Sequence, residues 1–287
     1  MEIQTITEDN LDIIRTVCLD PSVDKKTRNL MENGMEERVK WIKKMIPKGL
    51  ELLVAFEKPR EEYIDYKWVG KILHSDLAVN DRVPMGLIEF LPIECALEPI
   101  TGKNSLFINC MWILPPFWNQ GVGKILLESF IEKAKELGSG SVISYEGDKW
   151  FGTSISYMAS AFFNKFGFQE VDRDGSRVLL YLDLGSSDPP KFTFPKIKSF
   201  NKNRNINLDI FFNNQCPWAR YMINTVKKGL TKYNIINCNV VDANQLDIIK
   251  ENGISRGIRL NNKIIFNRMA SWAEVQAAID KFLKNSQ

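Results

Sequence analysis

The chain has 287 residues, which is longer than most single domains, so we expect two domains. Its 44% hydrophobic and 25% charged residues, with a formal net charge of +3, are typical of an ordinary soluble globular protein. The first residues lack the basic and apolar regions of a signal peptide, and no apolar run approaches the roughly 20 residues that span a bilayer, so we expect a cytoplasmic protein.

Histidine and cysteine usage limits the chemistry further. His74 is the single histidine, and the five cysteines are scattered without a Cys-x-x-Cys pair. This pattern leaves no basis for a Ser-His-Asp triad, a metal site or a disulfide framework. From Asn201 onward, 13 Lys and Arg stand against 6 Asp and Glu, but they are spread without a dense block or interleaved aromatic residues. We interpret them as a solvated basic surface, with nucleic-acid binding as the less favoured alternative.

Up to residue 92 the sequence predicts three strands and three helices. The expected strands cover 2–7, 50–56 and 84–92, and the expected helices cover 11–18, 36–45 and 61–75. Asp9 or Asn10 can cap the first helix. In the strand at 84–92 side chains alternate between faces, so Glu89 is expected to face away from Ile88 and Phe90.

A strand, a turn with two glycines and an amphipathic helix follow one another between residues 104 and 138. The apolar run 106–114 is too short for a core helix, and Pro115 and Pro116 end it. From residue 126 apolar residues recur at helical spacing until Gly138, a typical C-terminal stop. The helix therefore begins near Gly121.

This turn is a candidate anion site. The first N–H groups of a helix lack partners within it, and Gly121 and Gly123 have no Cβ to keep a phosphate away. The alternative is an ordinary tight turn. A Walker phosphate loop and a dinucleotide fingerprint are both excluded, because the required Gly-Lys-Ser/Thr ending and the third glycine are absent.

The rest of the chain falls into two parts. A strand at 141–145, a helix at 154–166 and a strand at 177–183 complete the first sheet. A linker at 186–205 is predicted by composition, so we expect domains at 1–185 and 206–287. In the second domain we expect strands at 206–212 and 234–241, helices at 217–230, 245–251 and 272–283, and a hairpin at 257–266.

Two motifs resemble the GNAT acetyltransferase superfamily. Its acetyl-CoA loop, Arg/Gln-x-x-Gly-x-Gly/Ala, falls here on Trp118-Asn119-Gln120-Gly121-Val122-Gly123, where the glycines match and the leading residue does not. Phe162-Phe163-Asn164-Lys165-Phe166-Gly167-Phe168 is similar to the family's closing Leu-Tyr-Glu-Lys-Leu-Gly-Phe. The resemblance implies an α/β fold with the mixed GNAT sheet, acetyl-CoA as co-substrate and N-acetyl transfer to an amine.

The resemblance also implies which residues bind acetyl-CoA. The diphosphate would lie at Trp118, Asn119, Gln120, Gly121, Val122, Gly123 and Lys124. The backbone of Met111, Trp112 and Ile113 would pair with pantetheine where the fourth and fifth strands part, and Ser156 aligns with the family's pantetheine-contacting asparagine. Phe163 stands where the family has the tyrosine that protonates the CoA thiolate, and that role is not transferred to Tyr157.

Transfer to an amine requires a proton acceptor. Freeing an amine of pKa ~10.4 at pH 7 costs about 4 to 5 kcal/mol. We expect Glu89 to take the proton, with Tyr145 as the alternative, although Glu89 could equally be an ion-pair partner. The acceptor would be a small-molecule or protein amine, no metal is expected, and a homodimer is possible.

The overall layout resembles the YoaP-like acetyltransferases, which carry an extra C-terminal domain, and residues 206–287 are similar to a thioredoxin-like fold. Cys216-Pro217-Trp218-Ala219 falls at that fold's Cys-Pro-x-Cys, with Ala219 in place of the second cysteine and Arg256 at the expected cis-proline. A helix N-terminus should lower the pKa of Cys216, which makes it a candidate reactive thiol. Otherwise the domain is a scaffold that shapes the acceptor site.

An alternative function for the whole chain is a CoA-sensing or binding protein whose thioredoxin-like domain engages a partner.

Overall fold

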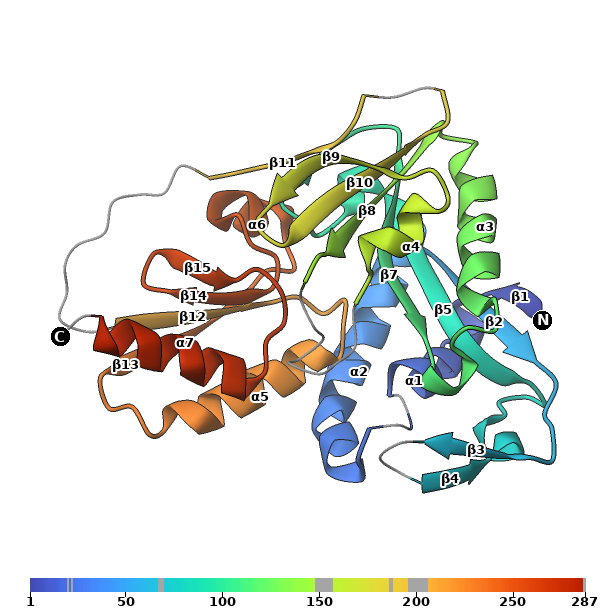
Figure 1. Ribbon diagram of the computed structural model, residues 1–287, viewed down its shortest axis with the longest axis horizontal. Coiled ribbons are helices and arrows are strands. Elements are labelled where there is room, and N and C mark those ends of the chain that lie inside the picture. Colours follow the sequence, from blue (N-terminus) through green and yellow to red (C-terminus); the bar gives the residue numbers. More distant parts are fainter. Residues whose placement is uncertain are drawn as a thin grey trace.

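Two sheets organise the chain in the computed structural model, which describes residues 1–19, 21, 23–66, 70–147, 157–185, 188–195 and 206–285 (Figure 1). The larger sheet has seven strands in the order β1-β2-β5-β7-β8-β10-β9. These strands are β1 (Glu2–Thr5), β2 (Glu51–Glu57), β5 (Val83–Pro92), β7 (Leu106–Ile113), β8 (Ser139–Tyr145), β9 (Gln169–Asp174) and β10 (Arg177–Asp183). β7 and β8 are parallel, and the other neighbours are antiparallel.

Helices cover both faces of this sheet. They are α1 (Asp12–Cys18), α2 (Lys25–Met45), α3 (Val122–Ala134) and α4 (Ser160–Asn164). Phe90 of β5 packs edge-on against Phe130 of α3, whereas Glu89 contacts α2, so the predicted alternation along β5 is confirmed. α2 begins eleven residues before its predicted start, because Asp24 caps it and its first turns are polar.

The helix predicted at 61–75 is wrong. The chain forms an antiparallel hairpin of β3 (Tyr63–Tyr66) and β4 (Gly70–Leu73), with Tyr63 opposite Leu73. Tyr, Ile and Val are enriched in strands because their branched or aromatic side chains pack well on a pleated surface. The mixed apolar spacing therefore reflected two short strands.

Part of the segment predicted as a linker is also ordered. β11 (Lys191–Phe192) pairs antiparallel with β6 (Ile100–Thr101), and the Phe192 N–H donates to Asp172 of β9 at 2.8 Å. This short strand crosses beside the edge of the larger sheet.

The C-terminal unit, as we call β12 to α7, has its own four-stranded sheet in the order β13-β12-β14-β15. Its elements are β12 (Ile206–Phe212), α5 (Trp218–Leu230), β13 (Ile236–Asp242), α6 (Leu246–Asn252), β14 (Gly257–Leu260), β15 (Lys263–Phe266) and α7 (Trp272–Lys284). β12 and β13 are parallel, and β14 is antiparallel to both of its neighbours. Each predicted element of this unit is confirmed within about two residues.

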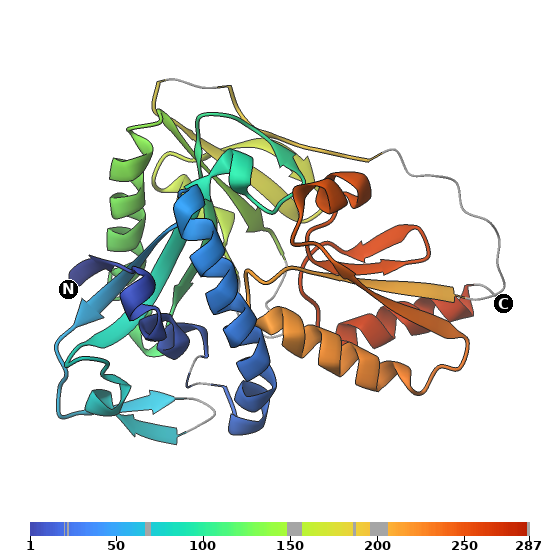
Figure 2. The same ribbon diagram turned by 180° about the vertical axis from the view of Figure 1, so that it is seen from behind.

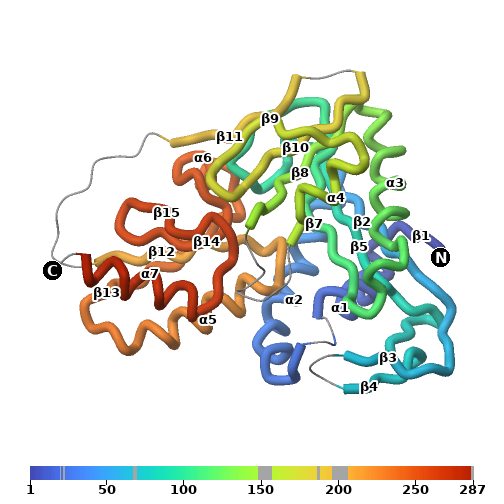
Figure 3. Tube along the Cα trace, viewed as in Figure 1, coloured from blue at the N-terminus to red at the C-terminus, as the bar shows by residue number. Residues whose placement is uncertain are grey.

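The C-terminal unit rests on α2. Figure 3 shows α2 and α5 side by side, and Figure 2 shows the same pair from behind. Gly34 lies at their crossing, where a Cβ would come within 2.5 Å of the Pro217 carbonyl oxygen. Within the described ranges, no helix combines the length and apolar character that crossing a lipid bilayer requires.

Candidate active site

The glycine turn before α3 leaves its helix N-terminus open. Gly121 is the N-cap with φ 82°, a left-handed conformation, and no side chain caps the helix. A Cβ at Gly121 would meet nothing within 4 Å. The first N–H groups of α3 are thus accessible to an anion, although the predicted diphosphate site stays a prediction.

Two polar side chains of the predicted site hold this turn in shape. The Trp118 indole donates to the Ile113 carbonyl at 2.7 Å, and the Gln120 amide donates to the Pro116 carbonyl at 2.8 Å. The side chain of Val122 is buried in the core. Backbone groups, more than side chains, are therefore what the turn offers to a ligand.

β7 and β8 part after three residue pairs. Leu106 to Ile108 pair with Gly140 to Val142, and the register ends there. We call the place where residues 109–113 of β7 leave β8 the fork. The parting of the fourth and fifth strands implied by the family resemblance is present.

Backbone direction decides which residues of β7 face the fork. The Leu114 N–H donates to the Met85 carbonyl on β5 at 2.9 Å. Because the backbone N–H and C=O groups of successive strand residues point to opposite sides, those of Trp112 also point to β5, and those of Met111 and Ile113 point to the fork. The Ile113 carbonyl already accepts the Trp118 indole. Met111 thus presents both of its backbone groups, whereas Trp112 does not.

Glu89 lies at the centre of a buried polar network. Its side chain is fully buried, and its two oxygens accept hydrogen bonds from Arg38 of α2 at 2.7 Å and from the Asn109 amide at 2.5 Å. Glu89 is therefore an ion-pair partner, which is the alternative role given for it from the sequence. Its catalytic role stays a prediction.

The C-terminal unit reaches into this network through Gln215. Its amide donates to the Asn109 carbonyl at 3.0 Å, on the side of β7 that faces the fork, and its own carbonyl accepts from Arg38. Arg256 donates to both the Gln215 side chain and Glu98, which lies just before β6. Glu98 also accepts a hydrogen bond from the Ser255 hydroxyl at 2.7 Å. A continuous chain of buried polar groups thus joins the two units.

Sequence reasoning missed these partners because they are far apart in the chain. Arg38 and Gln215 are separated by 177 residues, and no local spacing connects them. Arg256, which stands where the thioredoxin-like resemblance has a cis-proline, is a buried ion-pair partner of Glu98, and the described residues contain no cis peptide.

Tyr157, and not Phe163, lies at the fork. Phe163 packs in the core against Phe162 and Phe168. The helix predicted at 154–166 is described only as α4 from Ser160, so Tyr157 precedes it, and its hydroxyl lies 3.6 Å from the Cys110 sulfur. The ring of Tyr145 on β8 lies beside that of Tyr157, with 5.8 Å between the ring centroids and an interplanar angle of 39°. Ser156 lies outside the described residues.

The expected thiolate at Cys216 is wrong. Burial raises the pKa of the Cys216 thiol to about 11, although the charge of Arg38 and a backbone hydrogen bond from Trp218 act in the opposite direction. Burial likewise raises the pKa of Cys110 to about 12 and that of Tyr157 well above its usual value. All three groups are therefore protonated at neutral pH.

A comparison with protein families identifies the part of the chain that holds the turn and the fork. Residues 47–168 match the model of the acetyltransferase (GNAT) family. We call the part of the chain that contains this match, from β1 to β10, the GNAT domain. The prediction of a GNAT N-acetyltransferase is thereby confirmed, and the glycine turn and the fork both lie within the matched part of this domain.

Known relatives of the GNAT domain extend the comparison. Over 236 residues the chain is 28% identical to the "Uncharacterized N-acetyltransferase YoaP" of Bacillus subtilis (strain 168), covering 78% of each chain. The PaiA N-acetyltransferase of Thermoplasma acidophilum, solved with coenzyme A, is 14% identical and has a TM-score of 0.40 over 64% of this chain and 99% of its own. A GNAT acetyltransferase of Elizabethkingia anophelis, solved with acetyl-CoA, is 15% identical, with a TM-score of 0.35 over 64% and 97%.

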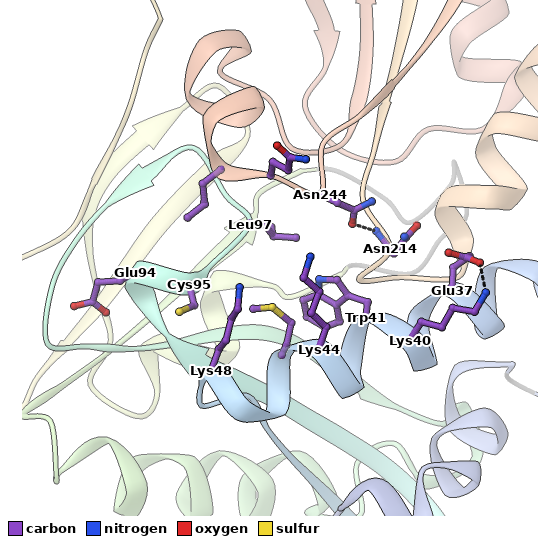
Figure 4. Close-up of a pocket in the computed structure, with 13 residues that line it drawn as sticks. Glu37, Lys40, Trp41, Lys44, Lys48, Glu94, Cys95, Leu97, Asn214 and Asn244 are labelled. Atoms are coloured by element: carbon purple, nitrogen blue, oxygen red, sulfur yellow. Dashed lines mark hydrogen bonds and ion pairs between the residues drawn. The ribbon is translucent and has the colours of Figure 1, made fainter.

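The GNAT domain and the C-terminal unit also enclose a cavity of about 400 Å³ beside α2 (Figure 4). It is lined by Trp41 and Lys44 of α2, by Leu97 after β5, and by Asn214 and Asn244 of the C-terminal unit. None of the site residues predicted from the sequence lines it. In the described part of the chain, no group of three or more His, Cys, Asp or Glu side chains is placed to hold a metal ion.

Proposed function

We propose that the chain transfers the acetyl group of acetyl-CoA to an amine at the fork between β7 and β8. The observation that carries the proposal is the open N-terminus of α3, which directly follows the forked strand β7 within the GNAT domain. The turn offers backbone N–H groups to a diphosphate, and the fork offers the backbone of Met111 to the pantetheine arm. Ser156 would complete the pantetheine contacts.

The transfer itself needs one proton taken and one given. The amine nitrogen attacks the thioester carbon, the carbon–sulfur bond breaks, and the sulfur leaves as a thiolate. We propose Glu89 as the acceptor of the amine proton, held in place by Arg38, with Tyr145 of β8 as the alternative. Tyr157 is the proposed donor to the thiolate, because it lies at the fork and burial keeps its hydroxyl protonated. The acceptor is a small-molecule or protein amine.

We further infer that the chain divides into a GNAT domain at 1–185, a linker at 186–205 and a thioredoxin-like domain at 206–287. The strand order β13-β12-β14-β15, the parallel β12–β13 pair and the position of Cys216 before α5 support this inference. Because the raised pKa of the half-buried Cys216 thiol disfavours the thiolate, the position supports a scaffold that shapes the acceptor site more than a redox centre.

Calorimetry with coenzyme A tests the diphosphate site. A Gly121→Val substitution forces a branched side chain into a left-handed conformation at the turn, so we expect CoA affinity to fall at least about tenfold. Gly175→Val is the matched control, because Gly175 has φ 62° and equally open space but lies in the hairpin between β9 and β10. Equal affinity in the Gly121 variant and the wild type would contradict the site.

Thiol release from acetyl-CoA across a panel of amines tests the reaction. Turnover with at least one amine supports acetyl transfer. If coenzyme A binds and no amine is turned over, the alternative of a CoA-binding or CoA-sensing protein is favoured instead.

A further inference from the structure

The cavity between the GNAT domain and the C-terminal unit has a charged rim. Lys40, Lys44 and Lys48 lie one turn apart on the same side of α2 and its extension, and all three line the cavity. Lys40 is paired with Glu37 at 2.9 Å, whereas Lys44 and Lys48 have no ion-pair partner among the described residues. Figure 4 shows Lys44 and Lys48 pointing toward the C-terminal unit while Lys40 turns to Glu37.

The two acidic residues that line the cavity, Glu37 and Glu94, form no ion pair with Lys44 or Lys48. Glu37 is committed to Lys40, and Glu94 accepts a hydrogen bond from the Asn104 backbone at 3.0 Å at the far edge of the cavity (Figure 4). Two cations therefore converge on a partly open space that both units line. Such an arrangement attracts an anion more strongly than isolated surface lysines, because the protein walls exclude part of the solvent.

The floor of the cavity is apolar. Trp41, Met45 and Leu97 line it, and all three are buried in the surrounding protein. On the opposite wall Asn214 and Gln245 of the C-terminal unit bring amide groups. A site with an aromatic floor, two cations and a few amides fits a small molecule with an apolar body and one anionic group.

The cavity wall is continuous with the network at the fork. The backbone N–H of Asn214 donates to the Asn244 side chain at 2.8 Å. The next residue, Gln215, donates from its side-chain amide to the Asn109 carbonyl. A ligand that contacts both α2 and Asn214 binds only when the C-terminal unit rests on the GNAT domain. Binding must then favour the docked arrangement, because a ligand stabilises the state to which it binds.

We propose that this cavity is a binding site for a small organic anion, distinct from the acetyl-CoA site, and that its ligand holds the two units together. Lys44 and Lys48 bind the anionic group, and the apolar body lies on Trp41. The proposal does not depend on acetyl transfer.

Phenylacetate and phenylacetamide are suitable probes because they share one shape and differ in charge. Titrated into the full chain at millimolar concentration, phenylacetate is expected to shift the indole N–H resonance of Trp41, assigned with Trp41→Phe, in a saturable manner, and to raise the midpoint of thermal unfolding. Phenylacetamide should bind at least about tenfold more weakly. Saturable, lysine-dependent binding of inorganic phosphate would also support the site and would show that charge dominates over the apolar body.

Lysine variants separate the cavity from general surface charge. Lys44→Gln and Lys48→Gln should each weaken phenylacetate binding about tenfold, whereas Lys43→Gln, an exposed neighbour on α2 that does not line the cavity, should not. Circular dichroism checks that each variant is folded. We expect all three variants to fold, because the three lysine side chains are exposed. The proposal is overturned if neither anion binds, if phenylacetamide binds as well as phenylacetate, or if Lys43→Gln has the same effect as Lys44→Gln.

Discussion

Gln215, on the loop before α5, donates a hydrogen bond from its side-chain amide to the backbone carbonyl of Asn109 on β7 at 3.0 Å. This bond satisfies a group that has no strand partner, since β8 has already left β7 at that position. Arg38 binds the Gln215 carbonyl and Glu89 from the other side. The C-terminal unit therefore contributes directly to the order of the fork.

Replacing Gln215 with methionine keeps the size of the side chain and removes both the donor to Asn109 and the acceptor for Arg256. The buried Asn109 carbonyl then loses its partner, which costs about 1 to 3 kcal/mol. Because Asn109 also binds Glu89, we expect kcat/KM for acetyl transfer to fall about tenfold to a hundredfold while the fold is kept, since the backbone bond to Arg38 remains. Steady-state kinetics of Gln215→Met measure this.

Asn234→Met is the control for the Gln215 variant. Asn234 belongs to the same unit, its side chain is exposed in the turn before β13, and it does not line the cavity beside α2. It should retain wild-type acetyl transfer. Unchanged kinetics in a folded Gln215→Met protein would mean that the C-terminal unit only touches the fork and does not position it.

The order of elements could be predicted from the sequence because local causes fix it. Pro115 and Pro116 end β7, Gly121 begins α3 in a left-handed conformation, and the strands and helices of the C-terminal unit follow their apolar periodicity. The hairpin of β3 and β4 was missed because two four-residue strands leave too short a pattern to separate from a helix.

The contacts of the site could not be predicted in the same way. Glu89 was placed on the correct face of β5, but its partner Arg38 lies 51 residues earlier, on the half of α2 that packs against the sheet. The high pKa of Cys216 has the same origin, because it depends on burial between two units and not on the helix that follows it. Periodicity shows which side chains are buried and not what they meet.

Gly34→Ala tests the packing of α5 on α2. Helix propensity alone would make alanine more stabilising by about 1 kcal/mol at this mid-helix position. The added Cβ, however, would come within 2.5 Å of the Pro217 carbonyl and 3.0 Å of its Cα, and such overpacking typically costs about 1 to 3 kcal/mol. We expect a lower midpoint of thermal unfolding.

The exposed neighbour Asn33 supplies the comparison for Gly34. Asn33→Ala gains helix propensity without a new contact, so its unfolding midpoint should rise slightly or stay the same. A Gly34→Ala midpoint at or above that of Asn33→Ala would show that the two units are not packed together at this crossing.

Tyr157→Phe tests the proposed proton donor. The variant removes the hydroxyl that lies 3.6 Å from the Cys110 sulfur, so kcat should fall about tenfold to a hundredfold, with water replacing the donor in part. Burial raises the pKa of Tyr157 well above its usual value near 10. Its ionisation should therefore cause no loss of wild-type activity between pH 8 and 10, and the ratio of wild-type to variant kcat should be constant over this range.

Tyr63→Phe is the control for Tyr157, because the Tyr63 ring is 68% exposed on the β3–β4 hairpin. It should leave kcat unchanged. A ratio for Tyr157→Phe that declines toward one as the pH approaches 10 would mean that Tyr157 titrates normally and is not enclosed at the fork.

The raised pKa values of two half-buried thiols make stability depend on pH in the alkaline range. Burial raises the pKa of Cys216 to about 11 and that of Cys110 to about 12, above the value of about 8.5 expected for an unfolded thiol. Their contribution to stability is therefore complete below about pH 8.5 and is lost as the pH rises through 11 and 12, because the unfolded chain gives up these protons first. The free energy of unfolding in urea should fall from pH 8.5 to 10.5, and Cys110→Ala should make that fall less steep.

At pH 7.5 iodoacetamide should alkylate Cys216 much more slowly than a short cysteine peptide, as followed by mass spectrometry. If Cys216 and the peptide were alkylated at equal rates, Cys216 would be an accessible thiol with an ordinary pKa, and it would not be packed near Arg38.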